Sequence, residues 1–258
     1  MGRSGVRAGA NCSLLPVDLT ERGAGTTRHP WEVQRFEAYR RILADHGALG
    51  ARRVLDVGAG DGWFTDMLGE VLPADATTVC WDVNYDDNDL EPSRPGQVRT
   101  RERPEHGNDL VLVLDVLEHV ADADGFVAVL RTVTDPGVPV LVAVPAYQAL
   151  FGAHDVALGH YRRYGRRQLL DQVAPWIEVL EHGSLFTSLV PLRAAGVVAG
   201  RFRPRAGTTH GIGDWTGGRA VTGAANGWLA ADARAGTALA RCGIRLPGLS
   251  HWAFGVGR

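Results

Sequence analysis

A glycine-rich turn follows a short apolar run in the first third of the chain. The run Val54–Val57 leads into Gly58, Gly60 and Gly62, with one residue between successive glycines. Glycines let the backbone turn sharply and approach a ligand closely, because a Cβ at such a position would collide with it. The pattern predicts a buried strand, then a loop that cradles a cofactor, then a helix.

The spacing of the loop argues against a dinucleotide cofactor. A dinucleotide fingerprint needs a further glycine that admits a pyrophosphate at the helix N-terminus, and Trp63 stands at that position. Asp56 and Asp61 would repel a phosphate and suit a cation, such as the ammonium and sulfonium of S-adenosyl-L-methionine. Asp82 lies 20 residues after Gly62, at the end of the next apolar run, where a carboxylate can bind both ribose hydroxyls.

The order of the apolar segments predicts the fold that positions this loop. We expect a helix from Trp31, strands at Arg53–Val57, Thr77–Val83, near Val98, Asp109–Leu114, Val138–Val144, Trp176–Leu180 and Leu246–Val256, and further helices at Trp63–Leu72, Phe126–Val133, Arg166–Val173 and Asn226–Arg241. This βαβ repetition indicates an α/β fold: a doubly wound Rossmann-like sheet, mostly parallel with an antiparallel last strand, and helices on both faces. Ligands of such sheets bind at the carboxyl ends of the strands.

Length and composition fit one globular domain. The chain has 258 residues, of which 45% are hydrophobic and 22% charged. We expect residues 1–28 to be a flexible N-terminal arm and residues 29–258 to form a single domain, with insertions at about 145–165 and 185–222.

Charge and cysteine usage exclude several classes of protein. A net charge of −2 and the lack of an aromatic and basic stripe disfavour a nucleic-acid partner. No apolar run approaches the roughly 18 residues of a membrane span. Cys12, Cys80 and Cys242 lie far apart and form no C-x-x-C pair, which favours a cytoplasmic location.

These motifs together resemble those of the class I S-adenosylmethionine-dependent methyltransferases. The first motif of that family reads V-L-D-x-G-x-G-x-G, and VLDVGAGDG matches it at every fixed position. The resemblance continues through WDVNY, DLVLVLDVLEHV and PGVPVLVAVP, and covers about Trp31 to Leu180. The segment AHDVALGHYRRY at 153–164 is similar to one in a bacterial subgroup of these enzymes that acts on small molecules.

The resemblance implies roles for particular residues. Gly58, Gly60 and Gly62 would line the methionine moiety of S-adenosyl-L-methionine. Asp56 or Asp61 would reach its ammonium group, Asp82 would hold the ribose, and Asp115 would face the methionine side; Glu102 is the candidate for the adenine contact.

Histidines are the candidates for acceptor chemistry. Methyl transfer needs a base only where the attacking atom must lose a proton, and His119, His154 and His160 lie in the right region. We favour His154, with Asp155 able to orient an imidazole, although each histidine could instead hold a loop by hydrogen bonds. Arginine and tyrosine side chains crowd the same segment: Tyr161, Arg162, Arg163, Tyr164, Arg166 and Arg167. They either bind an anionic acceptor or belong to a solvated helix start, where they pair with acidic side chains.

A metal-dependent alternative uses the same region. Asp115, Glu118 and His119 resemble the E-x-x-E-H turn of some magnesium- or zinc-assisted O-methyltransferases, in which a downstream histidine, here His154, completes the site. We favour the metal-free site, because this turn also occurs in metal-free relatives.

We therefore expect an S-adenosyl-L-methionine-dependent methyltransferase with a small-molecule acceptor, such as a secondary metabolite or a sugar- or lipid-linked precursor. The alternative is a protein of the same fold that binds the cofactor but regulates, or catalyses a non-methylating reaction such as cyclisation. The intact glycine loop favours cofactor binding in both cases.

Overall fold

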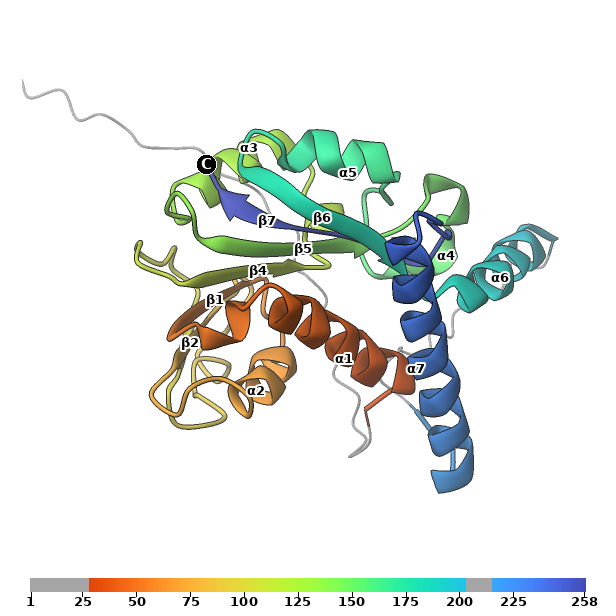
Figure 1. Ribbon diagram of the computed structural model, residues 1–258, viewed down its shortest axis with the longest axis horizontal. Coiled ribbons are helices and arrows are strands. Elements are labelled where there is room, and N and C mark those ends of the chain that lie inside the picture. Colours follow the sequence, from red (N-terminus) through yellow and green to blue (C-terminus); the bar gives the residue numbers. More distant parts are fainter. Residues whose placement is uncertain (1–27, 203–214) are drawn as a thin grey trace, which may run out of the picture.

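A seven-stranded sheet forms the centre of the protein. The computed structural model describes residues 28–202 and 215–258 (Figure 1). The strands are β1 (Arg53–Val57), β2 (Thr77–Trp81), β3 (Gln97–Thr100), β4 (Leu110–Leu114), β5 (Pro139–Pro145), β6 (Ile177–Leu185) and β7 (Ser250–Gly257), in the spatial order β3-β2-β1-β4-β5-β7-β6. Strands β1 to β5 pair in parallel, and β7 runs antiparallel to β5 and β6. The predicted doubly wound sheet with an antiparallel last strand is confirmed.

Helices cover both faces of the sheet (Figure 1). The α-helices of the described residues are α1 (Pro30–Asp45), α2 (Trp63–Gly69), α3 (Ala123–Arg131), α4 (Ala153–Ala157), α5 (Arg166–Val173), α6 (Val190–Phe202) and α7 (Arg219–Arg241), and the 3-10 turns are η2 (Ala48–Gly50), η3 (Leu117–His119), η4 (Gln148–Leu150) and η5 (Thr187–Leu189). α3 and α5 pack in one hydrophobic core, and α1, α2 and α7 pack in the other.

Alternate residues of the central strands face these two cores. Leu110 and Leu112 of β4 pack with Phe36 of α1, whereas Val111 packs with Phe126 of α3. Burial of each such side chain stabilises the fold by roughly 1.5–3 kcal/mol. Because both faces of the sheet are covered, a central strand is a continuous apolar run in the sequence.

The first turn of α1 is fixed by its own side chains. His29 Nδ1 accepts a hydrogen bond from the Trp31 N–H at 3.1 Å, and the Glu32 carboxylate accepts one from the His29 N–H at 3.3 Å. Pro30 occupies the first helical position. An N–H at this position would have no partner within the helix, so proline, which lacks one, costs no hydrogen bond there. This capping holds the start of α1 beside the glycine loop, where both line the same cavity.

The described structure departs from the sequence prediction outside the central sheet. The segment 145–165, expected as a loop, contains α4, whose five residues are too few to show helical periodicity. α7 begins at Arg219 rather than Asn226, because its mostly exposed first turns carry no apolar stripe. The predicted N-terminal arm lies almost wholly outside the described residues, as do residues 203–214 of the second predicted insertion. None of the described helices is long and apolar enough to cross a membrane.

Candidate functional site

The carboxyl ends of the parallel strands open into a cavity of about 660 Å³. This volume lies within the range of about 300–1,000 Å³ that is usual for small-molecule sites. The loop after β1, the turn after β4 and the first turn of α1 form one side, and α4, α6 and α7 form the other. Figure 1 shows α4, α6 and α7 gathered at one end of the sheet. The lining includes Asp56, Gly58, Gly60, Asp61, Asp115, Glu118, His119, His154, His160, Arg193 and Trp228.

Backbone strain is concentrated at this edge of the sheet. Among the described residues other than glycine, a positive φ occurs at Asp115 (55°), Tyr147 (60°) and Phe186 (65°). These residues follow β4, β5 and β6, directly or by two positions. Each such conformation costs about 1–3 kcal/mol and persists only where the surroundings fix it. The three strained residues therefore lie at the same edge of the sheet as the cavity.

The three glycines of the loop differ in what surrounds them. All have a positive φ: +68° at Gly58, +56° at Gly60 and +79° at Gly62. A Cβ on Gly58 would come within 2.6 Å of Val116 Cγ2, so this glycine allows close packing against the turn after β4. A Cβ on Gly60 would meet no atom within 4 Å and would enter the cavity. Gly60 is therefore the position at which the loop leaves room for a ligand.

Two of the predicted acids hold the loop itself. Asp82 is 2% exposed, and its carboxylate accepts hydrogen bonds from the Gly60 N–H at 3.1 Å and the Asn84 N–H at 2.9 Å. It lies beneath the lining rather than in it. Asp61 forms an ion pair with Arg28 and accepts the Trp63 N–H at 3.0 Å. The ribose and ammonium roles of these acids stay predictions.

Asp56 is a buried acid on the cavity wall. It is 3% exposed, and its burial, together with the charges of Asp82 and Asp61, raises its pKa to about 8. The carboxyl group is therefore protonated at neutral pH when nothing cationic lies beside it. An ammonium group in the cavity would favour the ionised form.

Asp115 lies opposite α1. It forms an ion pair with Arg35, whose guanidinium also lies over the Trp31 ring, 4.2 Å from its centroid. Arg35 and Trp31 were not identified from the sequence, because no local pattern marks a helix residue that meets a strand end far along the chain. Glu102, the candidate for the adenine contact, is exposed and lies outside the cavity lining.

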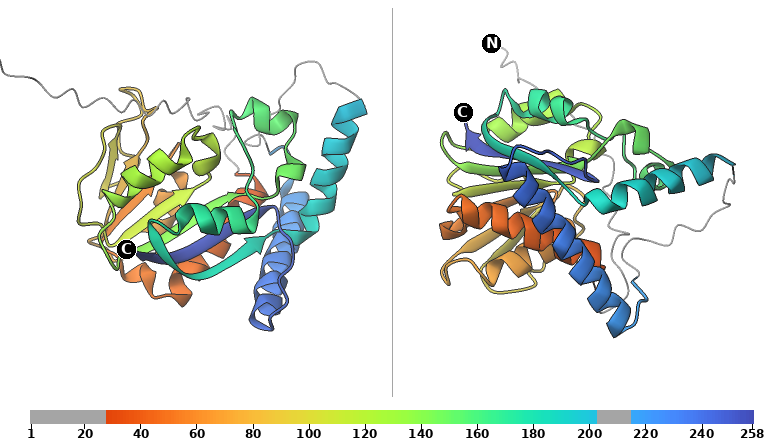
Figure 2. Two further views of the ribbon diagram at one scale, coloured as in Figure 1. Left: turned by 90° about the horizontal axis from the view of Figure 1, so that it is seen from above. Right: turned by 45° about the vertical axis from the view of Figure 1, so that its right-hand side comes forward.

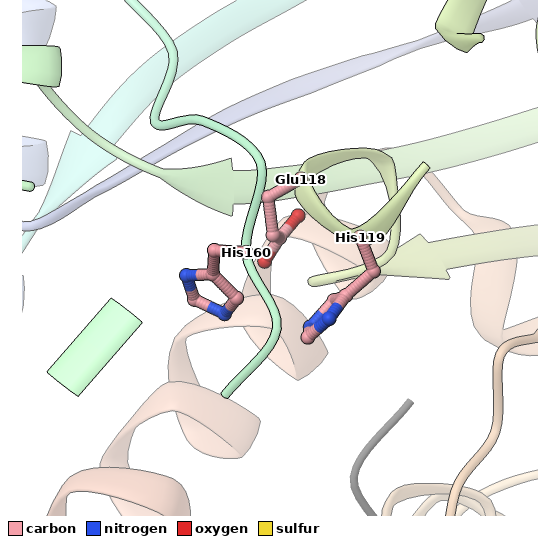
Figure 3. A group of neighbouring side chains, drawn as sticks. All are labelled: Glu118, His119 and His160. Carbon is pink, nitrogen blue, oxygen red and sulfur yellow. The ribbon is translucent and has the colours of Figure 1, made fainter. Parts of the chain in front are cut away.

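Glu118, His119 and His160 come together on the wall of the cavity. One ligand atom from each lies within 4.8 Å of the others, and the two imidazoles meet edge to face at 4.5 Å between centroids. Figure 3 shows the three side chains turned toward one another, two from the η3 turn and one from the segment after α4. Burial and the charge of Asp115 raise the pKa of Glu118 well above its usual range.

The GHYRRY segment is fixed to the η3 turn by hydrogen bonds. The Tyr161 N–H donates to the Glu118 carbonyl at 2.8 Å, Arg162 donates to the Ala121 carbonyl at 2.7 Å, and the Tyr164 hydroxyl donates to the Leu117 carbonyl at 3.2 Å. Arg162 therefore holds the loop. Of the other predicted cations, Arg166 and Arg167 are exposed, and Arg167 pairs with Asp171 at 3.5 Å.

Asp155 orients His160 rather than His154. Its fully buried carboxylate lies 3.1 Å from His160 Nδ1 and accepts hydrogen bonds from Arg163 and Arg193. Although burial raises the pKa of Asp155, the hydrogen bond from His160 and the charge of Arg163 hold it well below its usual range. His154 lines the cavity separately, and burial together with the Arg193 charge lowers its pKa.

Comparison with known proteins identifies a family. The sequence profile of a family described as "Methyltransferase domain" matches residues 31–189, more than half of the chain. A comparison with curated protein sequences gives no match.

Several solved structures are similar to this chain at low sequence identity. A protein from Galdieria sulphuraria assigned as a sarcosine dimethylglycine methyltransferase is 14% identical, with a TM-score of 0.50 over 88% of this chain and 85% of that one. The 4+2 cyclase SpnF is 19% identical, with a TM-score of 0.49 over 85% and 79%. The N-methyltransferase NodS from Bradyrhizobium japonicum WM9, in complex with S-adenosyl-L-homocysteine, is 15% identical, with a TM-score of 0.46 over 64% and 86%. The first of these likenesses describes the fold alone.

Proposed function

The chain belongs to this methyltransferase-domain family, and on that premise we propose that it methylates a small-molecule acceptor bound in the same cavity as its cofactor. S-adenosyl-L-methionine is the cofactor. One observation carries the proposal: a single cavity reaches from Gly60, where a side chain would find open space, to His154 and the imidazole pair.

The residues present fit a cationic cofactor without a pyrophosphate. Gly60 leaves open space beside the loop, and Asp56 places a carboxyl group at the wall with a pKa of about 8. We assign Gly58, Gly60 and Gly62 to the methionine moiety, Asp56 to the ammonium group, and Asp82 to the ribose side through the loop that it holds. When bound, the cofactor supplies a methyl group on a sulfonium, whose sulfur leaves without needing a proton.

The acceptor side combines an apolar wall with a polar end. Leu192 of α6 and Trp228 of α7 line the cavity together with Trp31, while His154, His160 and Arg193 provide polar groups. Such a lining suits an organic molecule with a large apolar part and one reactive polar group.

The chain itself would contribute to the reaction in two ways. It would hold the cofactor and the acceptor beside each other, and it would remove a proton from the acceptor. Holding two reactants in the right geometry can contribute about 7–11 kcal/mol toward the barrier. His154 has a pKa below the usual value, so its imidazole is neutral at pH 7 and can accept a proton from the acceptor. We keep His154 as the candidate base, since His160 lies against the Asp155 carboxylate and packs edge to face with His119.

Labelled S-adenosyl-L-methionine, incubated with the protein and an extract of the producing cell, tests this function. We expect mass spectrometry to find a labelled, methylated small molecule that is missing when Gly60→Val replaces the wild-type protein. Cofactor binding without any labelled product would contradict the proposal and favour a non-methylating role. A labelled nucleic acid or protein would contradict the acceptor class.

A further inference from the structure

A buried carboxylate without a partner lies beside two imidazoles on the cavity wall. Glu118 is 0% exposed, and neither of its carboxylate oxygens has a hydrogen-bond partner in the described part of the chain. An oxygen of Glu118 and one ring nitrogen each of His119 and His160 lie within 4.8 Å of one another (Figure 3). Burying a carboxylate is costly unless it is paired or coordinates a metal. A small cation among these three atoms would satisfy it.

His160 is held in the orientation that a metal ligand needs. Its Nδ1 lies 3.1 Å from the buried carboxylate of Asp155, so that its Nε2 carries the lone pair and faces away from that carboxylate. Histidines that bind metals commonly give their other N–H to a carboxylate in this way. Arg163 in turn donates to Asp155 at 2.7 Å. The imidazole is therefore oriented by the chain itself.

The two segments that carry the ligands are joined through the main chain. The Tyr161 N–H donates to the Glu118 carbonyl at 2.8 Å, and the Arg162 side chain donates to the Val120 carbonyl at 3.0 Å. These bonds hold the segment after α4 against the η3 turn. Since a site formed in advance loses little freedom on binding, the geometry favours an ion at the cluster.

We propose that Glu118, His119 and His160 bind one divalent first-row transition-metal ion of the Zn²⁺ type. Two imidazoles and one carboxylate are a donor set that suits zinc, whereas magnesium and calcium take oxygen ligands. Three protein ligands leave one position of a tetrahedral site open, and all three residues line the cavity. Binding of the ion does not depend on which reaction the protein catalyses. A further step rests on the proposed function: an oxygen atom of the acceptor binds the ion at its open position.

This ligand set differs from the one that the sequence suggested. Asp115 forms an ion pair with Arg35, and His154 lies outside the cluster. His160 takes the place of the downstream histidine. The proposal also departs from the metal-free site that the sequence analysis favours, because the sequence does not show that the Glu118 carboxylate is buried without a partner.

Metal titration of the full chain tests the proposal. After treatment with EDTA and removal of the chelator, the protein is titrated with Zn²⁺ by calorimetry and with Co²⁺ by its visible absorption. We expect one high-affinity ion per chain, a tetrahedral Co²⁺ spectrum and a higher melting temperature with Zn²⁺. Glu118→Gln and His160→Asn should each lower the affinity by more than about tenfold.

His154→Asn and His106→Asn are the matched controls, and both should bind the ion as the wild type does. His154 shares the cavity, and His106 is an exposed histidine paired with Asp135. Weak binding by the wild type, or equal affinity in a folded Glu118→Gln variant, would overturn the site and leave an adventitious ion only. Where Glu118→Gln does not fold by circular dichroism, His119→Asn replaces it. Titration of the same samples with S-adenosyl-L-methionine distinguishes failure of the metal site from failure of the cofactor site.

Discussion

The proposed cofactor side and the proposed acceptor side of the cavity are built in different ways. On the cofactor side, the chain from Gly58 to Gly62 is fixed by main-chain geometry and by the buried carboxylate of Asp82. On the acceptor side, α6 and α7 extend away from the sheet (Figure 2). Both helices carry exposed large apolar side chains. Leu192 is 64% exposed and Trp228 is 62% exposed.

The cofactor side would therefore recognise its ligand mainly through the backbone, and the acceptor side mainly through side chains. A loop set by strand ends and glycines has one geometry, so substitution there should lower cofactor affinity sharply. A wall of helical side chains changes its shape with each side chain, so substitution there should alter selectivity gradually. We therefore expect variants of the two sides to fail in different measurements.

The largest effect on the acceptor side alone is expected from His154→Ala. Loss of a general base lowers kcat by about 10²–10⁴. Cofactor affinity should stay at the wild-type value, and the exposed variant His106→Ala should keep full activity. In the wild type, activity should fall with pH only below about pH 6.5, because burial lowers the pKa of His154. Full turnover by His154→Ala would remove this residue from the mechanism.

On the cofactor side, Asp82→Ala should weaken binding of S-adenosyl-L-methionine roughly 10- to 150-fold. The substitution removes the charged acceptor of the Gly60 N–H and the Asn84 N–H, and loss of such a hydrogen bond costs about 1.5–3 kcal/mol. Asp87→Ala, at an exposed acid of the following loop, is the matched control. Equal affinity of Asp82→Ala and wild type in a calorimetric titration would show that the loop does not depend on this carboxylate.

Asp56 should make cofactor affinity depend on pH. Its pKa of about 8 keeps it protonated at pH 6, and an ammonium group beside it must displace that proton. Affinity should therefore rise from pH 6 to 7.5, by up to about tenfold per unit. Asp56→Asn should bind with an affinity that does not change over this range. If the affinity of Asp56→Asn still rises steeply with pH, the proton that is lost on cofactor binding belongs to another group.

The same residue predicts a change in the stability of the ligand-free protein. Because the folded-state pKa of Asp56 is raised above its unfolded value, stability is lost as pH rises from about 4 to 8. Asp56→Asn should therefore have a higher melting temperature than the wild type at pH 8, and a similar one at pH 4. A lower melting temperature at pH 8 would mean that the ionised carboxylate is paired in the fold.

The smallest effect is expected at the apolar wall. Trp228 lines the cavity and donates from Nε1 to Ser188 Oγ at 2.9 Å. Trp228→Ala should raise KM for the acceptor several-fold and leave cofactor affinity unchanged. Val221→Ala, an exposed position of α7 outside the lining, is the matched control. A change in cofactor affinity in Trp228→Ala would show that the two sides are not separate.

The sequence predicts the glycine-loop side of the cavity far better than the side that contains α4 and His160. The strand Arg53–Val57 and the glycine loop were correct in position and type, because a buried strand and a sharp turn leave strong local patterns. The segment that ends in His160 was expected as a loop, and Asp155 was not assigned to a particular histidine. Which histidine meets Asp155 depends on the path of five residues of α4, and no periodicity records that path.

Burial is also the reason that the sequence analysis grouped Glu118 and His119 with Asp115 and His154 rather than with His160. The sequence shows Glu118 and His119 as neighbours in a common turn, but not that the carboxylate is fully buried and without a partner. Likewise Arg35 reaches Asp115 from 80 residues away, so only the packing of α1 against the strand ends reveals the pair. Long-range contacts of this kind come from the tertiary fold rather than from local spacing.

Calorimetric titration of S-adenosyl-L-methionine into the wild type and Gly60→Val tests most directly whether the loop holds the cofactor. We predict one bound molecule per wild-type chain and no measurable binding to Gly60→Val, because its side chain fills the space beside the loop. Gly60→Ala should be weakened as well, and circular dichroism should find both variants folded. A wild-type protein that does not bind, or a folded Gly60→Val variant that binds as tightly as the wild type, would contradict this account.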